Sequence, residues 1–390
     1  MGCQFDQLVN RRNTHSLKWD GVLELFGEDN LIPMWIADMD FRPPEVVVRA
    51  VTDRAAHGIY GYENKPANYI AAVIKWLENR HDWQIDPKWI SHSPGVVPGL
   101  ALAILALTEP QDRVVIQPPV YPPFYAVVRD NDRVVVENPL LFRDGKFTMD
   151  FADLEEHFRS GVKLMILCSP HNPVGRVWRE EELRQLEQLT AQYGVTVLSD
   201  EIWSDLAFPG HKHRPLASLS PEMASRTLTF MAPSKTFNLA GFYLSNVIIP
   251  NPDLQKKFCS QLQRLGLVHL NFFGLVASEA AYREGGEWLD LLLDYLQKNA
   301  DYAIEELGKI TPKIKVLKPE GTFVLWLDCR ELGVPPEELN NFFVSKAGIA
   351  FSDGSVFGPA GYGFQRMNIG CPQVVIAEAM KRLSKALAKN

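Results

Sequence analysis

The chain has 390 residues, of which 46% are hydrophobic and 22% are charged, and its formal net charge is −7. This composition is that of an ordinary globular protein, and a net negative charge without any block of Lys and Arg argues against nucleic acid as a partner. No apolar run approaches the roughly 20 residues that a membrane helix requires, and the sequence opens without the apolar core of a secretion signal. We therefore expect a cytoplasmic protein with no membrane partner.

The first 45 residues show no strong hydrophobic period, and they end in the run MWIADMDFRPPE, which is rich in Trp, Pro and Asp. A stretch without strand or helix periodicity that nevertheless contains large apolar side chains is expected to pack against other parts of the chain. We predict an ordered N-terminal arm over 1–42, which packs elsewhere or forms part of a smaller domain.

Short apolar runs alternate with longer helical patterns through the middle of the chain. The run EEELRQLEQLTAQY at 180–193, for example, has apolar residues at helical spacing and acids in its first turn. Such alternation predicts an α/β fold with a mostly parallel central sheet covered by helices on both faces, and we expect this large domain to occupy 43–286. The predicted strands are 113–118, 133–136, 163–168, 195–199, 227–231 and 246–249.

The C-terminal part has a different pattern. A long amphipathic helix is expected across 288–307, and it is followed by the strand-like run TFVLWLD and by a final helix from about residue 374. We predict a second, smaller α/β domain over 287–390.

Polar residues directly follow three of the predicted strands, which is where ligands bind in open parallel sheets. The runs are SPHNPVG after 163–168, DEIW after 195–199, and APSKTF after 227–231. Asp200 and Lys235 in these runs could form a simple ion pair. Together with the Asn-Pro-x-Gly turn, however, they match a pyridoxal-phosphate site, which needs a lysine for the Schiff base, a carboxylate for the pyridine nitrogen and an amide for the phenolate oxygen.

The motifs extend over nearly the whole chain. They are WIADMDF, YGY, SPGVVPGL, PPVYPPFY, LCSPHNPVGRVW, SDEIWSDL, PSKTFNLAG and GFQRMNIGCP, in this order. With them the chain resembles fold-type I pyridoxal-phosphate enzymes of the class I/II aminotransferase family. Within that family it most resembles the branch of cystathionine β-lyases and cysteine-S-conjugate β-lyases (C-S lyases).

The resemblance implies a role for each of four residues around the cofactor ring. Lys235 is the Schiff-base lysine, Asp200 pairs with the pyridine nitrogen, and Asn172 bonds the phenolate oxygen. Tyr121 stacks on the ring, and it counts with Lys235 and Asp200 as catalytic. Trp203 departs from the family pattern, which often has Tyr or His three residues after the aspartate. Its indole N–H can donate to the phenolate oxygen but cannot accept a hydrogen bond.

The resemblance also implies how the cofactor phosphate is held. The main-chain N–H groups of Val96 and Val97 precede a predicted helix and can cradle the phosphate, although a loop that merely starts a helix would look the same. Tyr62 is expected to reach the phosphate from the partner subunit, which implies a homodimer with shared active sites, but a packed aromatic is the other reading. Ser234 and Tyr243 are further candidates.

Two departures from the family pattern affect the phosphate. Many aminotransferases place a Ser three residues before the lysine and an Arg eight residues after it, where this chain has Ala232 and Tyr243. Elsewhere, Arg366 matches the arginine that grips the substrate carboxylate by a two-pronged pair.

The expected reaction begins when Lys235, freed by the substrate amine, removes the α-proton as a base. Loss of a β-thiolate from cystathionine or a related cysteine S-conjugate then gives thiol, pyruvate and ammonia. An aminotransferase would use the same residues, so only WIADMDF and PSKTFNLAG, together with the lack of a motif for a second substrate carboxylate, favour the lyase. A regulatory or binding protein with a vestigial site is a third hypothesis, which the intact set of site residues disfavours.

No metal site is predicted. His211 and His213 form an HxH motif in a Gly/Pro-bounded loop, and His171 lies apart from them; without a nearby set of acids or cysteines we expect the HxH loop to be solvated surface. The five cysteines are scattered, so neither a disulfide framework nor a zinc site is expected.

Overall fold

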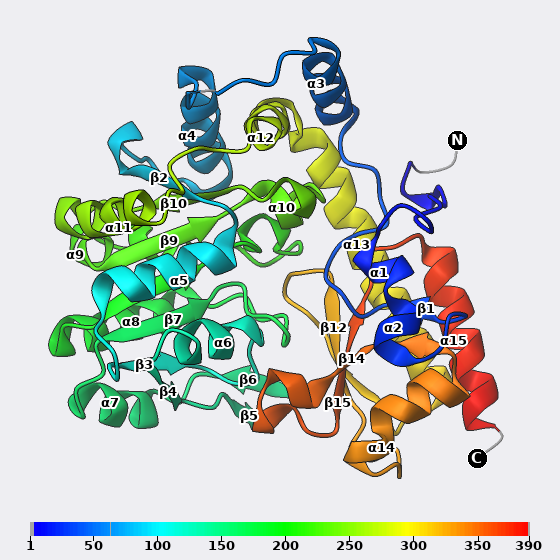
Figure 1. Cartoon of the computed structure of the whole chain (residues 1–390). Coiled ribbons are helices and arrows are strands. Elements are labelled where there is room, and N and C mark those ends of the chain that lie inside the picture. Colours follow the sequence, from blue (N-terminus) through cyan, green and yellow to red (C-terminus); the bar gives the residue numbers. More distant parts are fainter. Residues whose placement is uncertain (1–3, 63, 389–390) are drawn as a thin grey trace.

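The computed structural model describes residues 4–62 and 64–388. A seven-stranded sheet lies at its centre (Figure 1). Strand β10 runs antiparallel to both of its neighbours, and the other neighbouring pairs are parallel, so the predicted mostly parallel sheet is confirmed. The strand order is β2 (Ile90–Ser93), β10 (Ser245–Ile248), β9 (Thr227–Met231), β8 (Thr196–Asp200), β7 (Leu164–Cys168), β3 (Arg113–Ile116) and β4 (Val134–Glu137).

Helices cover both faces of this sheet because its inner strands are apolar on both sides. In β7, Leu164 and Ile166 pack into one core with the first group of helices, while Met165 and Leu167 pack into a second core with the other group. This two-sided burial explains why β7 reads as an unbroken apolar run. The first group is α5 (Val96–Leu107), α6 (Pro123–Arg129) and α11 (Pro252–Arg264), and the second is α7 (Phe151–Arg159), α8 (Glu180–Tyr193) and α9 (Pro221–Ser225).

The C-terminal part forms a second, four-stranded antiparallel sheet beside the first (Figure 1). The predicted long helix, the strand in TFVLWLD and the final helix are all present. The domain boundaries after residues 42 and 286 remain a prediction. The elements are α13 (Gly286–Ile310), β11 (Lys315–Leu317), β12 (Val324–Asp328), α14 (Pro336–Asn341), β14 (Ser352–Asp353), β15 (Phe364–Asn368) and α15 (Gln373–Leu387), and the strands lie in the order β11, β12, β15, β14.

The N-terminal arm packs on this second sheet unit. Strand β1 pairs in parallel with β13, and Val22 and Leu31 share a small core with Val344 and Ala350. The arm is thus in contact with residues that lie more than 300 positions further along the chain. The arm contains α1 (Leu17–Asp20), α2 (Val22–Phe26) and β1 (Ile32–Pro33), and its partner strand is β13 (Ile349–Ala350).

Beyond the β2 edge of the large sheet, helix α12 (Phe272–Glu284) packs against both α3 (Glu45–Ala56) and α4 (Ala67–His81) (Figure 1). Two small elements complete the large part: the hairpin of β5 (Leu141–Arg143) with β6 (Lys146–Thr148), and the one-turn helix α10 (Pro233–Thr236).

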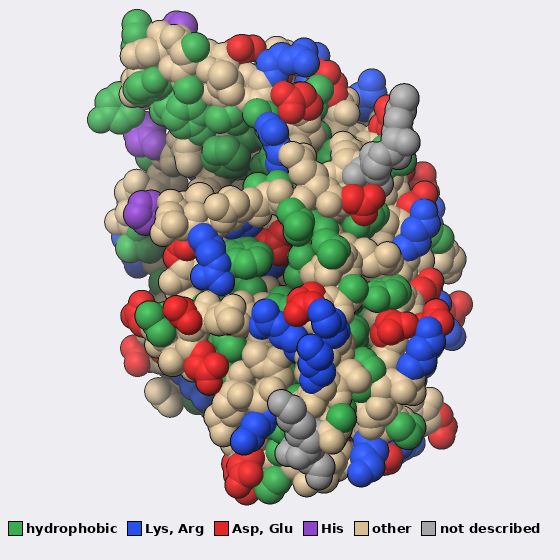
Figure 2. Space-filling model, turned by 90° about the vertical axis from the view of Figure 1, so that its right-hand side faces the viewer, with side chains coloured by type: hydrophobic (Ala, Val, Ile, Leu, Met, Phe, Trp, Pro, Cys, Tyr) green, Lys and Arg blue, Asp and Glu red, His purple; other side chains and the backbone are tan. Residues whose placement is uncertain are grey.

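The surface carries both signs of charge. On the face drawn in Figure 2, acidic and basic side chains are interspersed, and hydrophobic side chains gather at its upper left. Within the described residues, every helix is too short or too polar to cross a bilayer. Cys168, Cys259, Cys329 and Cys371 are free thiols, and Cys3 lies outside the described residues.

Candidate active site

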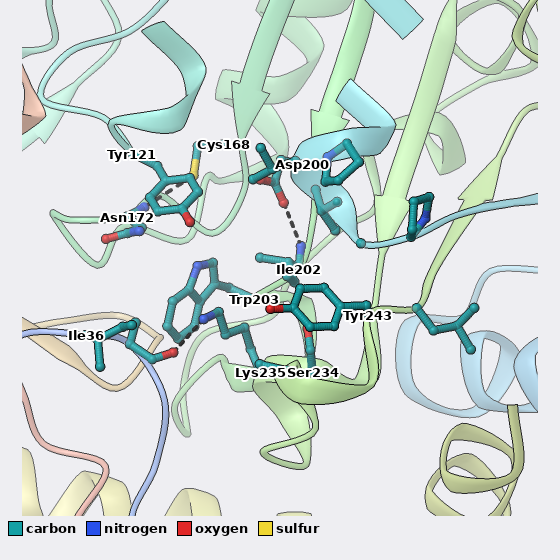
Figure 3. A pocket seen from close by; sticks show the side chains of 18 of the residues that line it. Ile36, Tyr121, Cys168, Asn172, Asp200, Ile202, Trp203, Ser234, Lys235 and Tyr243 are labelled. Carbon is teal, nitrogen blue, oxygen red and sulfur yellow. Dashed lines mark hydrogen bonds between the residues drawn. The ribbon is translucent and has the colours of Figure 1, made fainter. Parts of the chain in front are cut away.

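The ends of three neighbouring parallel strands meet at one edge of the large sheet. Cys168 at the end of β7 pairs with Asp200 at the end of β8, and Asp200 in turn pairs with Phe230 of β9. Asn172 follows β7, and Lys235 lies on α10, which follows β9. The expected convergence of these polar residues is therefore present, and their side chains point into one pocket (Figure 3).

This pocket is a cavity of about 300 Å³. Only three charged side chains, those of Asp200, Lys235 and Arg366, are among its lining residues in the part of the chain that the structure describes. Tyr62 is not a lining residue, and its side chain is 93% exposed. The other predicted site residues all line the cavity: Val96, Val97, Tyr121, Asn172, Asp200, Trp203, Ser234, Lys235 and Arg366.

Asp200 is a buried carboxylate with few hydrogen-bond donors around it. Its Oδ1 accepts one bond from the main-chain N–H of Ile202, at 3.1 Å. Burial raises the pKa of Asp200 to about 7, although the Ile202 bond and the charge of Lys235 act in the opposite direction. Such a carboxylate can still accept a strong bond from a protonated ring nitrogen, which would supply both a donor and a positive charge.

Lys235 has an amine that is easily deprotonated. Burial, and then the charge of Arg366, lower its pKa to about 8, while the carboxylates of Asp38 and Asp200 oppose this shift. Its Nζ donates to the main-chain oxygen of Ala37 and lies 5.5 Å from the centre of the Trp203 ring. The neutral amine is the nucleophile and the base, so this lysine is suited to both roles near neutral pH.

Arg366 on β15 brings a cation from the second sheet to the cavity. Its Nη1 donates to Asn172 Oδ1 at 3.0 Å, and its Nη2 donates to the main-chain oxygen of Trp35 at 2.6 Å and to Ser352 Oγ at 3.1 Å. Its Nε is buried and has no hydrogen-bond partner among the residues that the structure describes. Burial lowers the pKa of Arg366 to about 10, so the guanidinium stays positive at neutral pH and can bind a carboxylate.

Asn172 and Tyr121 lie at the β7 side of the cavity (Figure 3). Because Asn172 Oδ1 accepts from Arg366, its NH₂ group is left to donate. The phenol of Tyr121 is largely buried, and this burial raises its pKa. The ring-contacting roles of both residues remain predictions.

The first turn of α5 offers an anion site at another wall of the cavity. Gly95 precedes the helix with φ +103°, and the N–H groups of Val96 and Val97 are among those that a helix start leaves without intrahelical acceptors. Ser234 and Tyr243 also line the cavity, and Figure 3 shows the Tyr243 hydroxyl directed into it. Tyr243 has left-handed backbone, with φ +47°.

Cys168 and Ala37 line the cavity but were not expected there. Cys168 Sγ accepts from the main-chain N–H of Asn172 at 3.4 Å, and burial raises the pKa of this thiol well above its ordinary value. The position of Cys168 at the end of an apolar run was a usable signal. The contact between Ala37 and Lys235 had none, because it involves a main-chain oxygen.

A buried polar network lies next to Lys235, behind the cavity. Asp205 accepts hydrogen bonds from Thr236 Oγ1 at 2.8 Å, His81 Nε2 at 2.9 Å and Trp76 Nε1 at 3.0 Å. Burial acts to raise the pKa of Asp205, but these donors and the charge of His81 hold it below its ordinary value. Asp205 therefore fixes the residue that follows the lysine.

The two histidines of the HxH motif differ in burial. His211 is exposed, as expected, but His213 is only 3% exposed and its Nε2 bonds Glu201 Oε2 at 2.8 Å. The expectation of solvated surface is therefore wrong for His213, because the buried Glu201 carboxylate provides it with a partner inside the protein. His171 is also buried, with Nε2 against the main-chain oxygen of Pro119 at 2.9 Å.

Comparison with known proteins gives one family and several full-length relatives. The family model described as "Aminotransferase class I and II" matches residues 29–383. Cystathionine beta-lyase PatB of Bacillus subtilis (strain 168) is 46% identical over 385 residues, which cover 98% of this chain and 100% of the relative.

Two solved structures have nearly the same fold as this chain. Cystalysin from Treponema denticola, which contains a pyridoxal 5′-phosphate cofactor, matches with TM-score 0.96 and 36% identity over 100% of both chains. The pyridoxal-phosphate-bound C-S lyase from Staphylococcus hominis matches with TM-score 0.93 and 32% identity, covering 99% of this chain and 98% of that one.

Proposed function

Because this chain belongs to the aminotransferase class I and II family, we propose that it is a pyridoxal-phosphate-dependent carbon–sulfur β-lyase that acts on cystathionine or related cysteine S-conjugates. One observation carries the proposal: a single cavity holds a donor-poor carboxylate, a lysine amine of lowered pKa and a buried arginine, and full-length relatives named as C-S lyases share the fold.

The cavity residues fit the cofactor group by group. Lys235 would hold the aldehyde carbon covalently. Asp200, whose carboxylate accepts one hydrogen bond from Ile202, would accept another from the protonated pyridine nitrogen. Asn172 would donate its free NH₂ to the phenolate oxygen. The first turn of α5 would bind the phosphate through the N–H groups of Val96 and Val97. When bound, the cofactor withdraws electrons from the substrate's α-carbon.

Tyr121, Trp203, Ser234 and Tyr243 would complete the binding site. The first two bring aromatic faces to the ring region, and the other two bring hydroxyls to the wall beside α5. Ala232 carries no polar group, so the phosphate depends more on main-chain N–H groups than it does in relatives with a serine at this position.

The protein's own groups then carry out the reaction. Arg366, whose Nε has no hydrogen-bond partner among the described residues, binds the substrate carboxylate and so orients the α-carbon. The Lys235 amine, displaced by the substrate amine, accepts the α-proton. The bond between the β-carbon and sulfur breaks, sulfur leaves as a thiolate that takes up a proton, and water completes the conversion of the remaining three-carbon unit to pyruvate and ammonia.

The charges of the cavity favour this reaction over transamination of acidic amino acids. The side chain of such a substrate ends in a carboxylate that has no ammonium group beside it, unlike the distal carboxylate of cystathionine, so it needs a second cation from the protein. Among the described lining residues, the cations are Lys235 and Arg366, and both already have roles.

The proposed active unit is a cytoplasmic homodimer that shares its sites. Tyr62 is almost fully exposed and lies outside its own cavity, so it is free to reach the phosphate of a second copy. Nearby apolar side chains are also exposed: Ile59 is 68% exposed, Tyr60 56% and Val268 44%. A patch of this kind commonly marks a protein interface. The free thiols agree with a reducing compartment.

The experiment supplies cystathionine and S-alkyl cysteines to the purified, cofactor-loaded protein, with and without a keto-acid acceptor. Pyruvate and thiol formed without the acceptor are expected. Turnover only with the acceptor would show an aminotransferase instead. Bound cofactor without turnover in either condition would favour a regulatory or binding protein.

A further inference from the structure

The segment 35–41, here called the strap, accepts hydrogen bonds from both cations of the cavity, Lys235 and Arg366. Lys235 Nζ donates to the main-chain oxygen of Ala37. Arg366 Nη2 donates to the main-chain oxygen of Trp35, at 2.6 Å. Two carbonyls of one short segment are thus bonded to the proposed base and to the proposed carboxylate-binding group.

Two asparagines bind most of the remaining strap carbonyls. Asn368 Nδ2 donates to the oxygens of Ile36 and Asp38, both at 2.6 Å. From the other side, Asn238 donates to the oxygens of Met39 and Phe41, at 2.8 and 2.9 Å, and accepts from the Met39 N–H at 3.0 Å. Asn368 lies on β15 with Arg366, and Asn238 is three residues after Lys235. The strap is therefore hydrogen-bonded by a neighbour of each cation.

A buried cluster of charges fastens the strap from the arm side. Lys18 Nζ pairs with Asp40 Oδ2 at 2.7 Å, and these side chains are 1% and 5% exposed. Arg11 pairs with Asp40 at 2.7 Å and with Asp38 at 2.6 Å, and Trp19 Nε1 also donates to Asp40. Removing one partner of a buried ion pair leaves an uncompensated charge in the interior, which is strongly unfavourable, so the cluster holds the strap firmly.

We propose that the strap sets the positions of Lys235 and Arg366 relative to each other, and that Lys18, Asp40, Asn238 and Asn368 are positioning residues that hold it. The inference rests on the proposed function. These four residues do not line the cavity, whereas Ile36 and Ala37 of the strap do. They therefore act through the strap.

The strap should matter for substrate more than for cofactor. The non-covalent contacts proposed for the cofactor come from the first turn of α5 and from the ends of β7 and β8, none of which bonds the strap through the residues named above. The covalent contact, Lys235, does bond the strap. A loosened strap shifts the lysine amine and the arginine, and a misplacement of about 1 Å can cost up to about 100-fold in rate.

The first test is Lys18→Met, which keeps a long side chain, removes the charge and leaves Asp40 with Arg11. The readouts are kcat for an S-alkyl cysteine, the Kd of pyridoxal phosphate, and the Kd of 3-(methylthio)propionate. The last compound has the carboxylate and the thioether but lacks the amine, so it binds without reacting, and the visible absorption of the bound cofactor reports it.

We expect kcat to fall about tenfold or more and the Kd of 3-(methylthio)propionate to rise about fivefold. The Kd of pyridoxal phosphate should rise less, by about twofold, because Lys235 is the one proposed cofactor contact that bonds the strap and the phosphate, ring-nitrogen and phenolate contacts do not. Lys212→Met is the matched control, because Lys212 is 64% exposed and pairs with Asp82 at the surface. It should change none of the three quantities.

Asn238→Asp is the second test, in case Lys18→Met does not fold. It keeps the acceptor for the Met39 N–H and tolerates the left-handed backbone of Asn238, φ +59°, but it removes both donors to the strap. As for Lys18→Met, the Kd of 3-(methylthio)propionate is expected to rise more than the Kd of pyridoxal phosphate. Asn251→Asp is its control, because aspartate caps the start of α11 as well as asparagine does.

Unchanged kcat and 3-(methylthio)propionate affinity in either folded variant would overturn the proposal, as would an equal loss of affinity for both ligands. Failure of the proposed function has another signature: the wild type would then release no pyruvate from cysteine conjugates. The Kd of 3-(methylthio)propionate still tests the strap in that case. A wild type that binds neither ligand would overturn both proposals.

Discussion

Two buried carboxylates five residues apart, Asp200 at the cavity and Asp205 behind it, have opposite surroundings. Asp200 accepts one main-chain hydrogen bond, and burial raises its pKa to about 7. Asp205 accepts bonds from His81, Trp76 and Thr236, which overcome burial and lower its pKa. The protein thus satisfies one acid completely and leaves the other short of donors. The comparison indicates that Asp205 maintains structure, whereas Asp200 awaits a cationic donor from a ligand.

Among the variants of cavity residues, Lys235→Ala should have the largest effect. It removes both the covalent attachment point and the base, so we expect pyruvate release to fall by about a thousandfold or more. A coupled assay of pyruvate measures it. Lys163→Ala, at an exposed pair with Asp112, is the control. Activity near that of the wild type would contradict the role of Lys235.

Asp205→Asn tests the structural role of the carboxylate behind the cavity. It removes a charge that three donors satisfy, and it places an NH₂ group against at least one of them. We expect the cofactor-free protein to lose about 3 kcal/mol of unfolding free energy, as measured by urea denaturation. A variant as stable as the wild type would show that Asp205 is not the structural acid described here.

Asp200→Asn should increase the unfolding free energy of the cofactor-free protein, whereas Asp205→Asn should decrease it. The folded pKa of about 7 lies above the ordinary 3.8, so the folded state binds the proton more tightly, and stability is lost as pH rises from about 4 to about 7. Asparagine cannot ionise, so above about pH 7 the variant should be more stable by roughly 2 kcal/mol, with little difference near pH 4.

Urea denaturation at the two pH values measures this difference. Destabilisation at both would contradict the idea that Asp200 lacks donors. Added pyridoxal phosphate should reverse the order, since the wild-type carboxylate then gains its partner.

The smallest expected effect concerns the pH dependence of cofactor capture. The pKa of Lys235 is lowered to about 8, and only the neutral amine attacks an aldehyde. The rate of adduct formation with cofactor-free protein should rise about tenfold between pH 7 and 9 and then level off. Stopped-flow absorption measures it. A rate that keeps rising through about pH 10 would indicate an ordinary, solvated lysine.

Much of the fold and of the cavity follows from the sequence, because apolar runs mark buried strands and polar residues mark their ends. The positions of Asn172, Asp200 and Lys235 are predicted in this way. Arg366 is predicted from its motif, and it lines the same cavity. Strand β2 was missed because Ile90–Ser93 contains a single apolar residue. The direction of β10 was also beyond prediction, since an apolar run has no polarity.

The parts that sequence could not predict depend on contacts between distant segments. Lys235 and Ala37 are 198 residues apart, and their contact involves a carbonyl that every residue type possesses. The burial of His213 depends on Glu201, whose side chain could equally have faced solvent. The satisfaction of Asp205 requires side chains from α4 and α10. None of these three contacts leaves a pattern in the sequence near the residues that make it.

Peptide mapping of the borohydride-reduced, cofactor-loaded protein tests the central claim most directly. Reduction makes the lysine–cofactor bond permanent, so mass spectrometry can locate it. The account predicts that the cofactor's mass is found on the peptide that contains Lys235. A stoichiometric adduct on a different lysine, or no adduct in a protein that releases pyruvate from cysteine conjugates, would contradict it.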